Sequence, residues 1–508
     1  MAPYFLRSLV PKREKRADQR PILQVLRGLT WVQWAMFFSG WLAWTCDAID
    51  FFSVSLSVKR LSEQFDRPVH DITQSITLTL LFRSVGAIIF GILSDRYGRK
   101  WPLVANLIIV AVLELGAGFM RTFREFLALR SLFGIGMGGI WGLAASTALE
   151  NLPVEARGLA SGILQQGYAV GYLLAAVVNL KLVPSTSETW RTLFWTAAGI
   201  SFFAAIVRLL LPESEAFVRA REAKMAEGSD TGESKTRLFL RETKQMLRQH
   251  WLLCIYAVLL MSGFNFLSHG SQDLYPTYLQ VSKGFTDHQA SIATIIGNCG
   301  AIAGGAIAGF ISQYLGRRLT IIVFVCLIAA FIPLWILPNG FSALAAGAFC
   351  IQFGVQGAWG VIPIQLAEMS PPAFRATFPG VAYQLGNMVS SASAQIEATG
   401  GDHQRTTLKH PDGSPALDPA GTPIEIPDYA KVQGILIGAV AAFVLLITVV
   451  GPERHGAHFE DPAYVAGAEG EGRTDKDRDA REEGSSTEEK AGSRQASIRY
   501  DEVAGEKV

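Results

Sequence analysis

The chain has 508 residues, of which 50% are hydrophobic and 18% charged, and its formal net charge at pH 7 is +1. Apolar stretches of about 20 residues, long enough to cross a bilayer as a helix, recur along most of it and predict an all-α membrane protein. The near-neutral charge argues against nucleic acid as a partner, and five scattered cysteines without CxxC spacing predict neither a disulfide framework nor a metal site.

Basic residues open the chain, and the positive-inside rule predicts that residues 1–30 are a cytosolic segment. This segment has only a short apolar run, which does not indicate a cleavable signal peptide. Hydropathy then predicts an N-terminal bundle of six spans over residues 31–211. These spans are expected at residues 31–58, 72–94, 101–120, 126–150, 158–182 and 190–211.

A polar stretch, residues 212–250, is predicted to be a cytosolic central loop, and helical spacing over residues 236–248 indicates an amphipathic helix. A C-terminal bundle of six spans follows over residues 251–451, with residues 398–430 expected as an extracellular loop. These spans are expected at residues 251–280, 289–313, 319–338, 342–367, 376–397 and 431–451. Lys and Arg gather in the alternate loops on the side of the N-terminus, so both termini are predicted to be cytosolic.

The charged tail, residues 452–508, is poor in apolar residues and is predicted to be disordered. Ser497 lies three positions after a basic residue, and Lys476 and Lys490 lie in the same tail. One interpretation is regulation by a kinase, a ubiquitin ligase or an arrestin-type adaptor. The alternative is a solvated tail in which these residues have no specific role.

The chain repeats itself at an offset of 218 residues. The offset superposes distant motifs, including Glu150-x6-Arg157 on Glu368-x6-Arg375 and the glycine-rich turn near residue 98 on that near residue 316. One offset for several motifs predicts two six-helix halves in parallel orientation, a transporter architecture with its site between the halves near the midplane.

The segment from Gly91 to Lys100, Gly-Ile-Leu-Ser-Asp-Arg-Tyr-Gly-Arg-Lys, resembles the loop 2–3 signature of the major facilitator superfamily. The resemblance implies twelve membrane-spanning helices in two pseudo-symmetric bundles and a role for this motif in stabilising one state of the transport cycle. The alternative is a positively charged turn without a gating role. The candidate gating residues, including those of the repeated Glu and Arg motif, are Gly91, Asp95, Arg96, Gly98, Arg99, Glu150, Arg157, Glu368 and Arg375.

Span seven carries a polar face made of Asn265, Ser268, His269 and Gln272, at positions i, i+3, i+4 and i+7, with Asp273 at its edge. An ionisable residue in the bilayer costs at least about 2.5 kcal/mol, which indicates an aqueous cavity rather than lipid. The stretch from residue 265 to 277 resembles the signature of the fungal lactate/pyruvate:proton permeases of the sialate:proton symporter branch. The resemblance implies uptake of short carboxylates with protons across the plasma membrane.

A carboxylate substrate needs a cationic partner, and Arg83 in the middle of span two is the candidate. The alternative is a permanent ion pair of Arg83 with Asp47 or Asp50 of span one. Proton coupling needs a group that titrates near the working pH. An unperturbed histidine has a pKa of about 6.5, which makes His269 the first candidate. Asp47, Asp50 and Asp273 are further candidates. His269 could instead be structural, and Asp273 could be a gate residue or a helix-end partner.

Neutral side chains complete the predicted substrate site. Gln384 and Asn387 share a face of span eleven, and the resemblance implies that they contribute to specificity. Tyr168 in span five is a weaker candidate, and Glu114 in span three has no predicted partner. The alternative for the amides is hydrogen bonding between helices.

The leading hypothesis is a proton-coupled importer of lactate and pyruvate, with acetate and propionate as further candidates. A dicarboxylate:proton symporter for malate or succinate is the close alternative, and a carboxylate sensor that transports nothing is the alternative of another class. No Walker motif and no nucleophile–base pair occurs in the sequence, so neither an ATP-driven pump nor an enzyme is expected, and no cofactor is implied.

Overall fold

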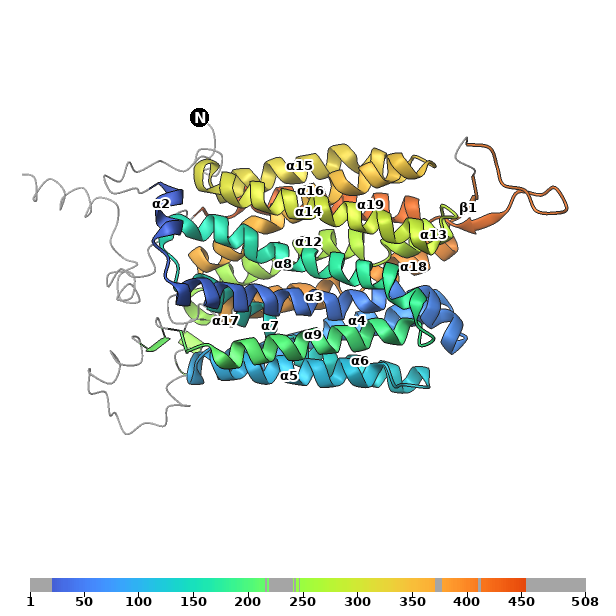
Figure 1. Cartoon of the computed structure of the whole chain (residues 1–508). Helices are drawn as coiled ribbons and strands as arrows, with labels where there is room; N and C mark the ends of the chain where they lie inside the picture. Colours follow the sequence, from blue (N-terminus) through green and yellow to red (C-terminus); the bar gives the residue numbers. More distant parts are fainter. Residues whose placement is uncertain are drawn as a thin grey trace, which may run out of the picture. The chain divides into compact units, whose positions relative to one another are not determined.

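The computed structural model describes residues 21–214, 217–218, 241, 244–245, 247–370, 377–409 and 413–453. Its long helices lie lengthwise beside one another (Figure 1). The N-terminal half contains α3 (Trp31–Phe65), α4 (Val69–Tyr97), α5 (Lys100–Ala117), α6 (Phe123–Met137), α7 (Ile140–Leu149), α8 (Val154–Lys181) and α9 (Trp190–Leu210), preceded by α2 (Ile22–Arg27). The C-terminal half contains α12 (Trp251–Gln272), α13 (Tyr275–Val281), α14 (Asp287–Leu315), α15 (Arg317–Ile336), α16 (Phe341–Met369), α17 (Thr377–Ser390), α18 (Ser393–His403) and α19 (Tyr429–Val450).

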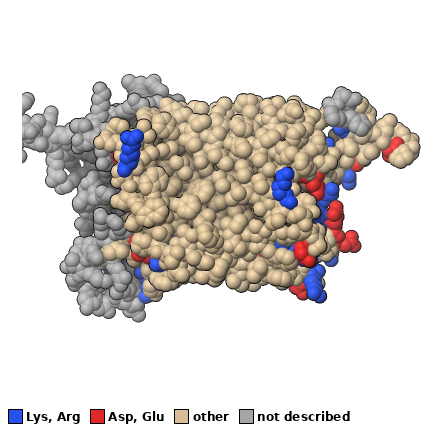
Figure 2. Space-filling model, viewed as in Figure 1, with Lys and Arg blue, Asp and Glu red and all other residues tan. Residues whose placement is uncertain are grey.

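Length and composition fit a protein that crosses the membrane many times. Ten spans in the described part of the chain are long and apolar enough to cross a bilayer. Helix α3 and the broken pair α17–α18 occupy the remaining two of the twelve expected positions. On the visible flank, charged side chains gather toward the ends and leave the middle almost free of them, as a lipid-facing belt requires (Figure 2).

Local sequence signals fix where several of these helices begin. Thr30, Thr122 and Thr286 are N-cap residues whose side chains accept a hydrogen bond from the backbone N–H three residues later. In each case the side chain at that third position accepts from the cap residue's own N–H, which completes a capping box. Each box satisfies N–H groups that the first helical turn would leave without a partner.

The internal repeat has a structural counterpart. Helices α4 and α14 begin and end 218 residues apart. The turns before them share a left-handed residue, Asp66 with φ 51° and Gly284 with φ 68°. The turns after them share a glycine, Gly98 with φ 101° and Gly316 with φ 88°, a backbone conformation that disfavours any side chain. The two halves therefore repeat the same local geometry.

Three helices are interrupted where the halves meet. The fourth span divides into α6 and α7 at residues 138–139, the seventh into α12 and α13 at residues 273–274, and the eleventh into α17 and α18 at residues 391–392. At the first break a side chain on Gly138 would collide with the backbone carbonyl of Arg83. Glycine there lets α4 and the α6–α7 junction approach closely, as small residues do between membrane helices.

The two ends of the bundle differ in the elements that they contain. The α2 end contains α2 and the turns at Gly98 and Gly316, and the hairpin end contains β1 (Arg405–Thr407) and β2 (Glu425–Pro427). These strands pair antiparallel, with Thr406 opposite Ile426. The expected loop at residues 398–430 begins later than predicted because α18 continues to His403.

Most of the predicted central loop and almost all of the tail lie outside the described residues. The candidate modification sites Lys476, Lys490 and Ser497 are among them.

Candidate functional site

An ion pair joins α3 and α4 inside the N-terminal half. Arg83 Nη2 donates to Asp47 Oδ2 at 3.1 Å, and Arg83 is only 1% exposed. Arg83 Nε and Asp47 Oδ1 have no hydrogen-bond partner among the described residues. Because a guanidinium can bind carboxylates through several N–H groups, Arg83 retains donor capacity beyond its pair with Asp47.

Phe51 of α3 connects Arg83 to the predicted polar face of α12. The guanidinium carbon of Arg83 lies 5.3 Å from the centre of the Phe51 ring, and the His269 ring lies 5.5 Å from it in an edge-on arrangement. Tyr383 of α17 is in hydrogen-bonding reach of both Arg83 and Asn387. Arg83 and His269 therefore border one region between the halves.

A chain of hydrogen bonds fixes His269. Its Nδ1 lies 3.1 Å from Asp273 Oδ2, and its Nε2 lies 3.0 Å from Asn387 Oδ1. Asn387 Nδ2 donates to Gln384 Oε1 at 2.6 Å, and Gln384 Nε2 donates to the backbone carbonyl of Gly138 at 3.1 Å. Since a carbonyl can only accept, it orients both amides, and Asn387 presents its oxygen to the ring. Both ring nitrogens then face acceptors, an arrangement that the doubly protonated imidazolium satisfies.

The other polar residues of the α12 face bond within the C-terminal half. Asn265 Nδ2 donates to the backbone carbonyl of Tyr383 at 3.1 Å. Ser268 donates to Gln272 Oε1 at 3.0 Å, and Gln272 Nε2 donates to Gln352 Oε1 of α16 at 2.7 Å. The face is buried inside the protein rather than exposed on its surface, and Gln352, which the sequence did not single out, bonds to it.

Aromatic side chains surround this region. Tyr168 of α8 stacks on Trp44 of α3 at 5.2 Å between ring centres. Tyr383 stacks on Trp141 of α7 at 4.6 Å and meets Trp359 of α16 edge-on at 5.7 Å. These rings come from both halves and pack against one another where the halves meet.

A second buried ion pair lies in the N-terminal half and was not predicted. Arg130 Nη1 of α6 donates to Glu114 Oε2 of α5 at 2.6 Å, and the Arg130 guanidinium lies 3.9 Å from the Phe133 ring centre. Asp50 accepts a hydrogen bond from Ser201 at 2.8 Å and is not in ion-pair distance of a cation among the described residues. Glu114 therefore has a partner, and Asp50 does not share the one that Asp47 has.

The candidate gating residues form matching ion pairs at the α2 end. Arg99 Nη2 lies 3.0 Å from Glu150 Oε1. At the repeated position, Arg317 donates to both oxygens of Glu368, at 2.9 and 3.1 Å. Each pair connects the turn after the second or eighth span to the end of the fourth or tenth span of the same half.

Two further carboxylates bind the same turns. Glu213 accepts the backbone N–H groups of residues 99 and 100, each at 3.0 Å. Glu453 accepts those of residues 317 and 318 at 3.0 and 2.9 Å. Both therefore place a negative group at the N-terminus of the next helix, where the helix dipole favours it. Burial raises the pKa of Glu453 against the lowering effect of the two N–H groups.

The remaining gating candidates each have different contacts. The Arg96 guanidinium lies 5.2 Å from the aromatic ring of the next residue. Arg157 Nε donates to the backbone carbonyl of residue 152 at 2.9 Å. The side chain of Asp95 and the whole of Arg375 lie outside the described residues.

Helices α8 and α14 bring the halves into close contact near the α2 end. A side chain atom on Gly162 would lie 2.6 Å from the carbonyl oxygen of Gly305 and 3.0 Å from the Cα of Gly309. Next to it, Ser161 donates to the carbonyl of Gly360 at 3.0 Å. The bare backbone at these positions is what lets the halves close here.

Gly162→Ala is therefore expected to hold the α2 end open. Overpacking costs about 1–3 kcal/mol, so the closed form should become about tenfold less populated. The measurement is the rate at which a thiol reagent modifies Ser161→Cys in a chain whose native cysteines are replaced by serine. Gly199→Ala is the matched control, because nothing lies within 4 Å of that position. Equal rates in both variants would contradict the close packing.

Polar contacts close the hairpin end as well. Arg60 of α3 donates to Asp287 of α14 at 3.3 Å and to Asn179 of α8 at 2.6 Å. Asn179 in turn donates to Ser291 of α14 at 3.2 Å. With contacts between the halves at both ends, Arg83 and His269 are enclosed, and His269 is 2% exposed.

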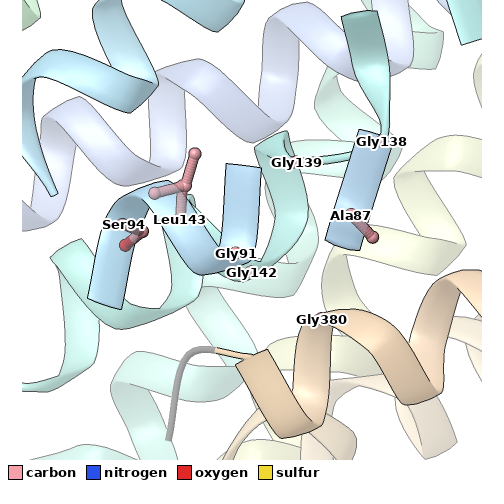
Figure 3. Close-up of a pocket in the computed structure, with 8 residues that line it drawn as sticks. All are labelled: Ala87, Gly91, Ser94, Gly138, Gly139, Gly142, Leu143 and Gly380. Carbon is pink, nitrogen blue, oxygen red and sulfur yellow. The ribbon is translucent and has the colours of Figure 1, made fainter. Parts of the chain in front are cut away.

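A small pocket lies where α4, α7 and α17 approach one another (Figure 3). It contains no charged side chain, and Ser94 is its single polar one, so it offers a carboxylate little to bind. Its lining consists of Ala87, Gly91, Ser94, Gly138, Gly139, Gly142, Leu143 and Gly380. No three His, Cys, Asp or Glu residues of the described ranges are placed to hold a metal ion.

Known proteins resemble this chain along most of its length. A carboxylic acid transporter protein homolog of Saccharomyces cerevisiae is 36% identical over 447 residues, which cover 86% of this chain and 71% of that protein. The cis,cis-muconate transport protein of Acinetobacter baylyi is 26% identical, covering 72% of this chain and 87% of the relative. The sialic acid transporter NanX of Escherichia coli is 26% identical, covering 69% and 82%.

The fold agrees with solved transporter structures. The xylose transporter XylE of Escherichia coli, in a partially occluded inward-open conformation, superposes with a TM-score of 0.62 at 17% identity and covers 84% of this chain and 99% of its own. The sequence profile of the Major Facilitator Superfamily matches residues 34–394. The expected fold of two six-helix halves and the expectation of a transporter rather than an enzyme are thereby confirmed: the chain belongs to the Major Facilitator Superfamily of membrane transporters.

Proposed function

We propose that this protein imports short-chain monocarboxylates together with protons across the plasma membrane by alternating access. Lactate and pyruvate are the proposed substrates, and acetate and propionate are further candidates. The observation that carries the proposal is the contact of Phe51 with both Arg83 and His269, because it places a guanidinium and an imidazole on one enclosed region between the halves. The similarity to a carboxylic acid transporter homolog of Saccharomyces cerevisiae supports the substrate class.

Arg83 is the proposed carboxylate ligand. Its Nε has no partner among the described residues, and its pair with Asp47 uses one N–H direction. A substrate carboxylate bound there would share or displace Asp47, and hydrogen bonds from a charged donor would hold it. Gln384, Asn387, Asn265, Ser268, Gln272 and Tyr168 are the proposed neutral contacts that orient the rest of the molecule.

His269 is the proposed proton site. Its imidazolium form is supported by acceptors on both ring nitrogens, Asp273 and Asn387. The chain that orients Asn387 ends on Gly138 of the opposite half, so separation of the halves at this point frees the amides to turn. An amide nitrogen facing the ring would favour the neutral form, which couples loss of the proton to the movement of the halves.

The ion pairs at the α2 end are the proposed gating elements. Arg99–Glu150 and Arg317–Glu368 hold each turn to its own half while the α8–α14 contact closes that end. With the positive-inside rule, this end is the proposed cytosolic one.

A dicarboxylate substrate is the second candidate because Arg130 adds a second buried cation to the N-terminal half. The hydrogen bond of Arg130 to Glu114 at 2.6 Å already engages this cation, which favours a substrate with one carboxylate. A sensor that binds carboxylates without moving them is the alternative of another class.

Uptake of labelled lactate into cells or proteoliposomes, with and without excess succinate and with a record of external pH, tests these candidates together. We expect uptake that raises external pH and that succinate does not inhibit. Inhibition by succinate would favour the dicarboxylate, and binding without uptake would favour the sensor.

Loss of the imidazole in His269→Ala is expected to reduce lactate-driven alkalinisation about tenfold or more, because a positioned proton-transfer group contributes about 100-fold or more to a rate. Surface levels, measured by labelling intact cells, should stay unchanged. Full proton cotransport in this variant would remove His269 from the mechanism.

A further inference from the structure

The C-terminal half contains a buried carboxyl group that the proposed cycle does not use. Glu397 of α18 is 0% exposed and lies between α12 and α19. Among the described residues, no Lys, Arg or His forms an ion pair with it. Burying an ionised carboxylate without a cation is so costly that such a group binds a proton instead.

The hydrogen bonds around Glu397 agree with a protonated carboxyl group. Gln433 Nε2 of α19 donates to Glu397 Oε2 at 2.9 Å. Glu397 Oε1 and Gln433 Oε1 accept no hydrogen bond of full geometry among the described residues. The hydroxyl of Ser393, one turn earlier on α18, acts on Glu397 as a nearby donor. A buried acceptor without a well-placed donor is costly, and a proton on Glu397 supplies one donor to this pair while it removes the charge.

Glu397 also lies next to the proposed proton site. A side chain atom on Gly270 would lie 3.3 Å from Glu397 Oε1, so this oxygen faces the bare backbone beside His269. The charge of Asp273, which holds His269 Nδ1, acts on Glu397 as well. Two carboxyl groups and one imidazole therefore form one set in which each proton changes the affinity for the next.

Further titratable groups on the neighbouring elements lie near the hairpin end. They are His70 and Asp71 of α4, Asp402 and His403 of α18, Glu425 of β2, and Tyr429 and Lys431 of α19. Asp402 is 3.7 Å from His70 and partly exposed. Asp402 follows Glu397 by five residues, which places Glu397 about 7.5 Å along the helix from the hairpin end.

We propose that Glu397 is a proton-binding residue of the transport cycle, placed between the hairpin end and the His269–Asp273 pair. A proton that enters at the hairpin end binds a carboxyl oxygen of Glu397. Because a negative charge is then lost, the His269–Asp273 pair binds the next proton less tightly. The proposal rests on the proposed proton coupling, but the presence of a titrating carboxyl group at residue 397 can be measured without any substrate.

Infrared difference spectra of the purified full-length protein, recorded between acid and alkaline pH, measure this directly. We expect a band from a protonated carboxyl group that titrates in the wild type and in Glu63→Gln, an exposed control, and that is absent in Glu397→Gln. In Gly270→Ala the added methyl group would lie 3.3 Å from Glu397 Oε1, so the band should shift. This variant keeps the test decisive if Glu397→Gln does not fold. A band unchanged in Glu397→Gln, or in Gly270→Ala where Glu397→Gln does not fold, overturns the proposal.

Transport in proteoliposomes tests the role in the cycle. We expect Glu397→Gln to lose lactate accumulation driven by a pH gradient about tenfold, while lactate–lactate exchange, which needs no net proton movement, stays within about twofold. Glu397→Asp, which keeps the carboxyl group, should recover part of the accumulation. Accumulation in Glu397→Gln with the pH dependence of the wild type would overturn the proposal. Wild-type protein that moves no lactate would instead contradict the proposed function, and the infrared band would then decide on Glu397 alone.

Discussion

Arg83→Lys is expected to abolish most lactate uptake while the protein still reaches the cell surface. Lysine keeps the positive charge beside Asp47, so the buried ion pair survives in part. It loses the planar set of N–H groups that can hold Asp47 and a substrate carboxylate at once. A hydrogen bond to a charged group is worth about 1.5–3 kcal/mol, so the affinity for lactate should fall about 10- to 100-fold.

The measurement is the concentration dependence of labelled lactate uptake, with surface protein quantified in the same cells. Arg121→Lys is the matched control, because Arg121 is exposed on the loop before α6 and should tolerate the same change. Unchanged lactate affinity in Arg83→Lys would show that Arg83 is only the structural partner of Asp47.

The sequence predicts the outline of this site because periodicity determines which residues share a helix face. Asn265, His269 and Gln272 repeat at helical spacing, and all three are buried between helices. The 218-residue repeat likewise predicts that Glu150 and Glu368 have equivalent settings, and each binds the arginine of its own turn.

Pairing between helices could not be predicted in the same way. Asp47 and Asp50 lie three residues apart on one helix, so either could pair with Arg83 as judged from the sequence. In the structure the packing of the helices brings Asp47 to Arg83. Glu114 and Arg130 lie on different helices, and neither shows a motif that would connect it to the other. The role of Gln352 could not be predicted either, because its partner Gln272 lies 80 positions away in the sequence.

The chain of hydrogen bonds from Gly138 to His269 shows what packing adds to the predicted residues. Gln384 and Asn387 were predicted from one shared face, but their orientation depends on the carbonyl of Gly138 in the other half. A backbone carbonyl has no sequence signature. The proposed link between closure of the halves and the proton on His269 therefore depends on packing, which the sequence does not show.

Arg130→Met is expected to destabilise the protein strongly. The variant removes the partner of Glu114, which is 0% exposed. Breaking a buried pair by removing one partner costs about 3–5 kcal/mol because the other charge is left uncompensated. Asp50, which lies near this pair, adds a further carboxyl group to the same region. Since proteins are stable by only about 5–15 kcal/mol, the yield of folded protein should fall and the unfolding temperature should drop by many degrees.

The double variant Glu114→Leu with Arg130→Met distinguishes lost charge balance from lost packing. Replacing both partners leaves no uncompensated charge, so the double variant should be more stable than Arg130→Met by several kcal/mol in thermal unfolding of the purified protein. Arg67→Met is the control, because Arg67 pairs with Asp71 at an exposed site, where such a pair contributes about 1 kcal/mol or less. If Arg130→Met were no more destabilising than Arg67→Met, the buried pair would not be a charge-balancing element. If the second substitution added to the damage, packing of the arginine against Phe133 would account for the cost of losing it.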